Sequence, residues 1–201
     1  RDGDADRYLG KGVLKAVSHV NNECRDVLIG LDSCDQRLID KALIEADGTP
    51  NKGNFGANAI LGCSLAAARA AAISLDQPLY QYLGGALCDT LPLPLFNMIN
   101  GGPYSAAPTD FQEFHAAPAG AKSFAEAMRM GVEVLQRLPE VIRKRHGAAA
   151  YRPGHLGGIG APSADPREVL ATLWAAVEEA GYADRFVLSL DCATSHLFDP
   201  E

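Results

Sequence analysis

Short apolar runs alternate with helical stretches in the second half of the chain, and this alternation constrains its fold most strongly. Residues 91–99, 111–117 and 185–191 have the apolar character of buried strands, and the last run ends in an acid. The helical stretches between the last two runs begin at Ser123 and Asp165, whose side chains can cap a helix. This order of strands and helices favours an α/β fold.

The first 90 residues have a different pattern, which is helical throughout. Apolar positions recur at helical spacing in residues 9–29 and 38–44, and residues 57–75 form an alanine-rich stretch that favours helix. A helical region therefore precedes the α/β region. The α/β region is much shorter than the roughly 250 residues of a closed eight-stranded barrel, so it forms either a small open sheet or part of a barrel.

Composition and charge exclude several classes of protein. With 47% hydrophobic and 21% charged residues, the chain is globular rather than disordered. A net charge of −7 argues against nucleic acid or an anionic membrane surface as the main partner. We find no uninterrupted apolar run as long as a membrane span, which needs about 18 residues, and no apolar signal peptide at the N-terminus. Five scattered cysteines without a C-x-x-C pair fit reduced thiols in the cytoplasm.

Both ends of the chain have the character of internal sequence. It begins at Arg1 rather than Met, and it stops just after the predicted strand at 185–191. We therefore expect it to be part of a longer protein.

Six segments resemble the enolase (phosphopyruvate hydratase) family in order and spacing, nearly from end to end. Among them are Asn-Lys-Gly-Asn-Phe-Gly-Ala-Asn-Ala-Ile within 47–62, Asn-Gly-Gly at the end of 94–102, and Gln-Glu-Phe at 112–114. The other three are residues 7–13, 124–131 and 190–195.

The resemblance implies an enolase-type α+β capping domain completed by residues 1–85. Residues 91–201 would then be the first three strands of a TIM-like (β/α)8 barrel. It also implies a cytoplasmic, Mg²⁺-dependent homodimer that dehydrates 2-phosphoglycerate, a small phosphorylated 2-hydroxy acid, in glycolysis. The family's base lysine and two further metal carboxylates would lie beyond this chain, so we expect the chain alone to be inactive.

Two acids match functional positions of the family. By this resemblance Asp191 is a Mg²⁺ ligand, and an oxygen ligand is what Mg²⁺ prefers. Glu113 matches an active-site glutamate that binds substrate and takes part in catalysis. Each acid also has an ordinary interpretation: Asp191 could cap the loop that follows it, and Glu113 could pair with a neighbouring cation.

Other matched positions are changed. Tyr104 stands where the family has a loop histidine, and with a pKa near 10 a tyrosine cannot replace imidazole at neutral pH. Leu156 stands where the family has the glutamate that acts as general acid, and it has no proton to give. The neighbouring His155 could serve as an acid instead, or it is an ordinary loop histidine.

Three functions stay open at this point. The first is an enolase-type lyase. The second is a divergent enolase-like enzyme of phosphonate antibiotic biosynthesis, of the carboxyphosphonoenolpyruvate synthase type. The third is a non-catalytic protein on the same scaffold. The changes at Tyr104 and Leu156 both affect the groups that would expel hydroxide, and this is why the second and third are considered.

Overall fold

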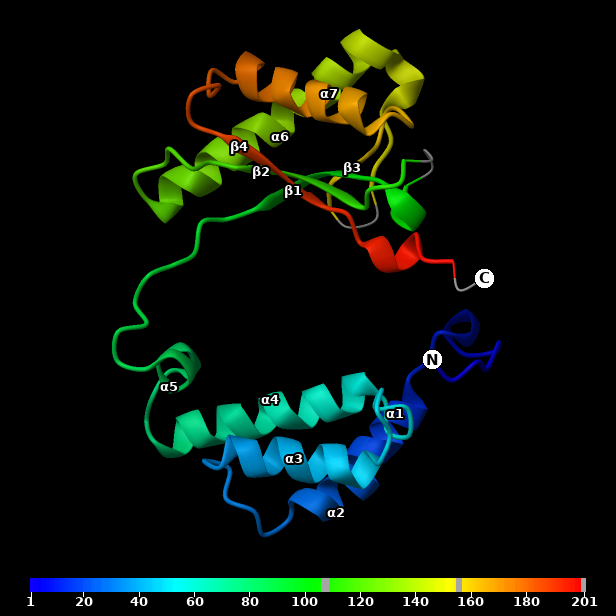
Figure 1. Cartoon of the computed structure of the whole chain (residues 1–201), viewed down its shortest axis with the longest axis vertical. Helices are drawn as coiled ribbons and strands as arrows, with labels where there is room; N and C mark the ends of the chain where they lie inside the picture. Colours follow the sequence, from blue (N-terminus) through cyan, green and yellow to red (C-terminus); the bar gives the residue numbers. More distant parts are fainter. Residues whose placement is uncertain (106–108, 155–156, 200–201) are drawn as a thin grey trace. The chain divides into compact units, whose positions relative to one another are not determined.

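The chain folds into two compact units, Arg1–Thr90 and Leu91–Glu201 (Figure 1). This computed structural model describes residues 1–105, 109–154 and 157–199, without the side chain of Tyr104. The boundary between the units coincides with the change of sequence pattern at residue 91.

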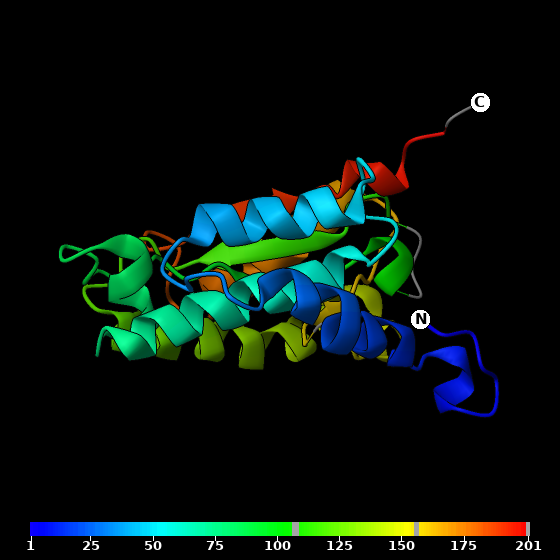
Figure 2. The same cartoon turned by 90° about the horizontal axis from the view of Figure 1, so that it is seen from below.

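The described elements of the first unit are all helical. They are the 3-10 turn Tyr8–Gly10, α1 (Leu14–His19), a π-helical turn (Val20–Cys24), α2 (Arg25–Leu28), α3 (Gln36–Asp47), α4 (Ala57–Ser74) and α5 (Leu79–Gly84). The helical pattern expected over residues 9–29 is thus divided by the π-helical turn. Figures 1 and 2 show α3 and α4 alongside each other in opposite directions.

A small core holds these helices together. It is formed by five buried side chains, Cys24, Ile39, Leu43, Ile60 and Cys63. The loop between α3 and α4 is ordered by the carboxylate of Asp47, which is only 1% exposed. This carboxylate accepts hydrogen bonds from the backbone N–H groups of Thr49 and Phe55, at 3.1 and 2.7 Å, and from the Thr49 hydroxyl. A buried carboxylate with several donors stabilises the loop because its charge is satisfied.

Helix α4 comes closer to a membrane span than the sequence led us to expect. Its 18 residues have a mean hydropathy of 1.3, so by length and composition it could cross a membrane, and it is the one helix of the described chain that meets this test. Much of this hydropathy comes from alanine, and the exposed Arg69 interrupts the apolar sequence of the helix. A core helix of a soluble protein meets the same test, and α4 packs against α3.

The second unit combines four strands with two long helices. In chain order it contains β1 (Phe96–Asn100), the 3-10 turn Gly102–Tyr104, β2 (Glu113–Ala117), α6 (Phe124–His146), the 3-10 turn Ala148–Ala150, β3 (Ile159–Gly160), α7 (Pro166–Glu179), β4 (Val187–Asp191) and the 3-10 turn Thr194–His196.

Two details differ from the sequence prediction. The strand expected over 91–99 begins only at Phe96, because Pro92 and Pro94 have no N–H to donate to a neighbouring strand. The two-residue strand β3 was not predicted, because it is too short to show a pattern.

The sheet has the order β3-β1-β2-β4. Strand β2 is antiparallel to both β1 and β4, whereas β1 and β3 are parallel. Figure 1 shows α6 and α7 on one side of this sheet. The core of the unit includes Ile99, Phe114, Val134 and Leu173, all with no exposed surface, which come from β1, β2, α6 and α7.

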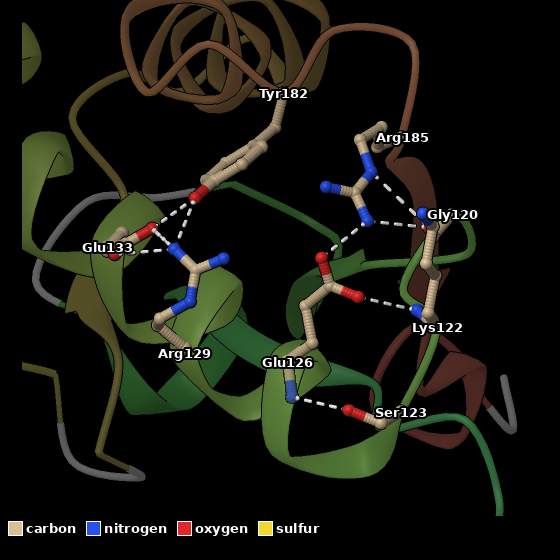
Figure 3. A network of polar contacts seen from close by, with 8 residues as sticks. All are labelled: Gly120, Lys122, Ser123, Glu126, Arg129, Glu133, Tyr182 and Arg185. Carbon is tan, nitrogen blue, oxygen red and sulfur yellow. Dashed lines mark hydrogen bonds and ion pairs between the residues drawn. The ribbon is translucent and has the colours of Figure 1, made fainter.

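Polar contacts fix the start of α6 to the segment before β4 (Figure 3). The Ser123 hydroxyl accepts the N–H of Glu126 at 3.1 Å, as expected for a helix cap. The Glu126 carboxylate accepts from the N–H of Lys122 at 2.7 Å and from Arg185 at 2.9 Å. These donors, led by the Lys122 N–H, hold the pKa of Glu126 below its ordinary value. Arg185 also donates to the carbonyl of Gly120 at 2.7 Å.

A second group of contacts lies one turn further along α6 (Figure 3). The Tyr182 hydroxyl donates to the carboxylate of Glu133, and Arg129 donates to the same carboxylate at 2.9 and 3.0 Å. These two groups of contacts join α6 to the segment between α7 and β4.

Candidate functional site

On the sheet face opposite α6 and α7, two neighbouring rows of side chains across β1, β2 and β4 consist of polar residues only. Residues directly opposed on neighbouring strands project their side chains to the same face. In one row Asn100, Glu113 and Asp191 are opposed on β1, β2 and β4. In the other, Asn97, His115 and Ser189 are opposed on the same strands. We call these six residues the polar face.

A β-bulge brings the two asparagines together. The pairing of β1 with β2 shifts between Asn97 and Ile99, so Met98 has no opposed residue on β2. In a regular strand, residues three apart face opposite sides. The bulge restores Asn97 and Asn100 to one face, and the Asn100 amide nitrogen donates to Asn97 Oδ1 at 2.9 Å.

Glu113 and His115 form a closely packed pair on β2. The distance between His115 Nε2 and Glu113 Oε2 is 2.9 Å, and the two side chains are 13% and 18% exposed. Within the described residues this is the only ion pair of Glu113. The neighbour of Glu113 is thus an imidazole of the polar face, and no lysine or arginine of the described chain makes an ion pair with Glu113.

Asp191 ends β4 at an exposed position. Its Oδ1 accepts the N–H of Ala193 at 3.0 Å, so Asp191 does cap the turn that follows the strand. This bond uses one oxygen, and a carboxylate has further lone pairs for a cation. The contact is compatible with either role of Asp191.

A glycine loop packs closely over Asn100. Asn100 is fully buried, and its Oδ1 has no hydrogen-bond partner among the described residues. A Cβ added to Gly154 would lie 2.3 Å from this oxygen, and one added to Gly158 would lie 2.8 Å from it. These glycines permit the backbone to approach the polar face on both sides of residues 155–156.

Three predicted site residues are not tested by the structure. His155 and Leu156 lie outside the described residues. Tyr104 ends the 3-10 turn Gly102–Tyr104 after β1, and only its backbone is described. The structure therefore places Glu113 and Asp191 opposite each other, and it leaves the positions of the other three side chains as predictions.

The polar face has oxygen donors that suit a hard cation such as Mg²⁺. They are the carboxylates of Asp191 and Glu113 and the unpartnered Asn100 Oδ1. No group of three or more His, Cys, Asp or Glu side chains within the described ranges could hold a metal ion. The carboxylate of Asp191 has the chemistry of a cation ligand, but the described residues do not form a complete metal site.

Comparison with known proteins identifies the family. The model of the enolase N-terminal domain matches residues 1–83, and the model of the enolase C-terminal TIM barrel domain matches residues 88–201. The chain belongs to the enolase family. Enolase of Methanothrix thermoacetophila is 48% identical over 198 residues, which are 98% of this chain and 47% of that protein. The chain spans about half the length of this curated relative. Membership of the enolase family implies a divalent metal.

Sequence reasoning missed four members of the polar face. His115 and Ser189 lie two residues from Glu113 and Asp191, so strand alternation alone could have placed them on the same face. Asn97 and Asn100 had no such signal, because their common face depends on the bulge at Met98.

Proposed function

We propose that this chain is part of an enolase-type lyase that dehydrates 2-phosphoglycerate to phosphoenolpyruvate with Mg²⁺. The observation that carries the proposal is the 48% identity to a protein named Enolase over 98% of the chain. The opposed acids Glu113 and Asp191 support it, because they put two of the required oxygen groups on one sheet face. The proposal includes a cytoplasmic homodimer as the working form.

The domain division is also part of the proposal. Residues 1–85 complete the capping domain, and residues 91–201 begin a TIM-like barrel. In barrels of this kind the catalytic groups lie at the carboxyl ends of the parallel strands. Asp191 ends β4 and Asn100 ends β1, so both are at the end of the sheet where such a site forms.

Each acid has a distinct role in this function. Asp191 would hold Mg²⁺, which supplies positive charge next to the carboxylate of the substrate. Glu113, largely buried beside His115, would bind the substrate and assist proton transfer at its hydroxyl group. Because Glu113 has no lysine or arginine partner in the described chain, its carboxylate is available to a bound ligand.

The decisive experiment is a turnover assay on the complete gene product that contains this chain. We expect phosphoenolpyruvate to form from 2-phosphoglycerate in the presence of Mg²⁺ and its formation to stop in EDTA. A folded, Mg²⁺-loaded protein without turnover would contradict the proposal. In that case activity on a phosphonate analogue would indicate a divergent enzyme, and failure to bind any phosphorylated 2-hydroxy acid would indicate a non-catalytic protein.

The substituted positions allow a second test of the same question. The double variant Leu156→Glu with Tyr104→His restores the residue types of the family. If the wild-type protein turns over slowly and these changes accelerate it, the site is that of an enolase whose acid groups have been altered. Unchanged or lower turnover would show that the wild-type site uses other groups for this step.

A further inference from the structure

The imidazole of His115 is fixed at one nitrogen only. Nε2 lies 2.9 Å from Glu113 Oε2, whereas Nδ1 is buried and has no hydrogen-bond partner in the described part of the chain. Buried polar atoms almost always have a partner in a folded protein, so an unpartnered nitrogen in the polar face points to a missing ligand.

The chemistry of the pair determines what each nitrogen can do. An ionised carboxylate only accepts hydrogen bonds, so the proton of this contact is on Nε2, and Nε2 donates to Glu113. In a neutral ring Nδ1 then has a free lone pair and accepts. A donor from a bound molecule would satisfy it.

Two donor-bearing side chains are opposed to the ring, those of Asn97 and Ser189, and neither donates to Nδ1 in the described structure. From β1 the ring is opposed by Asn97, whose Oδ1 already accepts from Asn100, and from β4 it is opposed by Ser189. The acids nearby are Glu113 on its own strand and Asp191, which is opposed to Glu113. No lysine or arginine of the described chain makes an ion pair with either acid.

We propose that His115 is a further substrate-binding residue of this site. Its Nε2–H positions the carboxylate of Glu113, and its Nδ1 accepts a hydrogen bond from a hydroxyl group of the bound substrate. The identity of the substrate rests on the proposed function. The pairing of His115 with Glu113 is independent of it. His115 thus gives the site an imidazole on β2. The loop histidine that the family resemblance leads us to expect is replaced by Tyr104.

Three substitutions in the complete gene product separate the two nitrogens. Gln at 115 can still donate to Glu113 but offers no acceptor at the Nδ1 position. Asn at 115 offers an acceptor near Nδ1 but does not reach Glu113. Leu at 115 keeps similar volume and lacks both groups. We expect kcat/KM to fall about tenfold in His115→Gln and His115→Asn and about 100-fold in His115→Leu.

A purely structural role predicts a different order. If His115 only fills space, the apolar His115→Leu variant would be as active as the other two or more active, and this result would overturn the proposal. His146→Gln is the matched control, because His146 Nε2 also makes one hydrogen bond, 2.7 Å to Thr172 Oγ1, and lies at the end of α6 away from the polar face. We expect His146→Gln to keep the wild-type kcat/KM.

An activity-independent measurement keeps the inference testable if the proposed function fails. In protein labelled with ¹⁵N-histidine, the ring signals of His115 are assigned by their loss in His115→Gln. We expect Glu113→Gln to shift the Nε2 signal and added 2-phosphoglycerate to shift the Nδ1 signal. If Glu113→Gln leaves the ring signals unchanged, the pairing is wrong. If only the response to 2-phosphoglycerate is missing, the assigned ligand is wrong.

Discussion

Glu113 and Asp191 are directly opposed on the antiparallel strands β2 and β4, with their side chains on the polar face of the sheet. Two like charges opposed in this way destabilise an antiparallel pair. His115 offsets part of this repulsion from the Glu113 side, whereas Asp191 has only the N–H of Ala193 in the described chain. A cation bound at Asp191 would therefore stabilise the sheet as well as serve the reaction.

Replacing Asp191 by Asn should weaken Mg²⁺ binding. We expect the Mg²⁺ concentration for half-maximal activity to rise at least tenfold, and the increase in melting temperature caused by Mg²⁺ to become smaller. Without Mg²⁺, Asp191→Asn should be as stable as the wild type, because it removes one of two like charges. Asp184→Asn, at an exposed position before β4, is the control and should keep the wild-type response. An unchanged Mg²⁺ dependence in Asp191→Asn would show that Asp191 is not a ligand.

Adding a methyl group at Gly158 should disrupt the loop over Asn100. The new Cβ would lie 2.8 Å from Asn100 Oδ1 and 2.9 Å from the carbonyl oxygen of Met98, and this backbone atom cannot move away easily. We expect Gly158→Ala to lower the free energy of unfolding by about 1–3 kcal/mol in a denaturant titration. Gly62→Ala on α4 meets no atom within 4 Å and should instead raise stability by about 0.5–1 kcal/mol. Equal effects of the two substitutions would contradict the close packing.

Asp47 should make the first unit sensitive to acid. Burial alone would raise the pKa of Asp47, but the hydrogen bonds from Phe55, Thr49 and Asn54 outweigh it and hold the pKa below its ordinary value of 3.8. A lowered pKa means that this stabilisation is complete above about pH 4 and is lost as the pH falls through the folded-state value.

Asp47→Asn tests this pH dependence by thermal unfolding of the gene product between pH 2 and 7. At pH 7 the variant should melt roughly 5 °C or more below the wild type, because an amide places a donor among donors. The difference should shrink at the acid end. Asp26→Asn, whose side chain is exposed, should change little. A difference that stays constant with pH would argue against an ionised Asp47.

The thiols of the first unit should differ sharply in reactivity. Burial raises the pKa of Cys24 to about 11, and the neighbouring thiol of Cys63 adds to the shift. Because the thiolate is the reactive form, iodoacetamide at pH 8 should label the exposed Cys34 while Cys24 and Cys63 react only after unfolding. Peptide mass spectrometry identifies the labelled positions. The raised pKa also predicts that stability falls as the pH rises from 9 to 11, since the folded state keeps its proton longer. Rapid labelling of Cys24 in the folded protein would contradict this prediction.

The sequence was sufficient for the α/β class, for the starts of α6 and α7 and for an acid at the end of β4. Local signals carried these predictions: Asp165 caps α7 by accepting the N–H of Arg167, and the acid at the end of the last apolar run is at the end of β4. The enolase family followed from colinear motifs and is confirmed by the match of both domain models.

The rest of the polar face depends on tertiary structure. No local pattern signals the bulge at Met98, because the bulge exists only in the pairing of β1 with β2. Likewise, the first part of the 91–99 run has apolar residues but cannot form a ladder, since its two prolines lack the donors. Hydrophobicity predicts a buried strand from residue 91, but Leu91, Leu93 and Leu95 are exposed and the strand begins only at Phe96. Backbone donors and strand register therefore decide where the strand forms.

The most direct test of the account is the rate of phosphoenolpyruvate formation by the Glu113→Gln variant of the complete gene product. The control is Glu140→Gln on α6, where the glutamate makes only exposed contacts with Arg137 and Lys144. We predict that Glu113→Gln loses about 100-fold or more in kcat while Glu140→Gln keeps the wild-type rate. Equal rates in the two variants would contradict a reaction at the polar face.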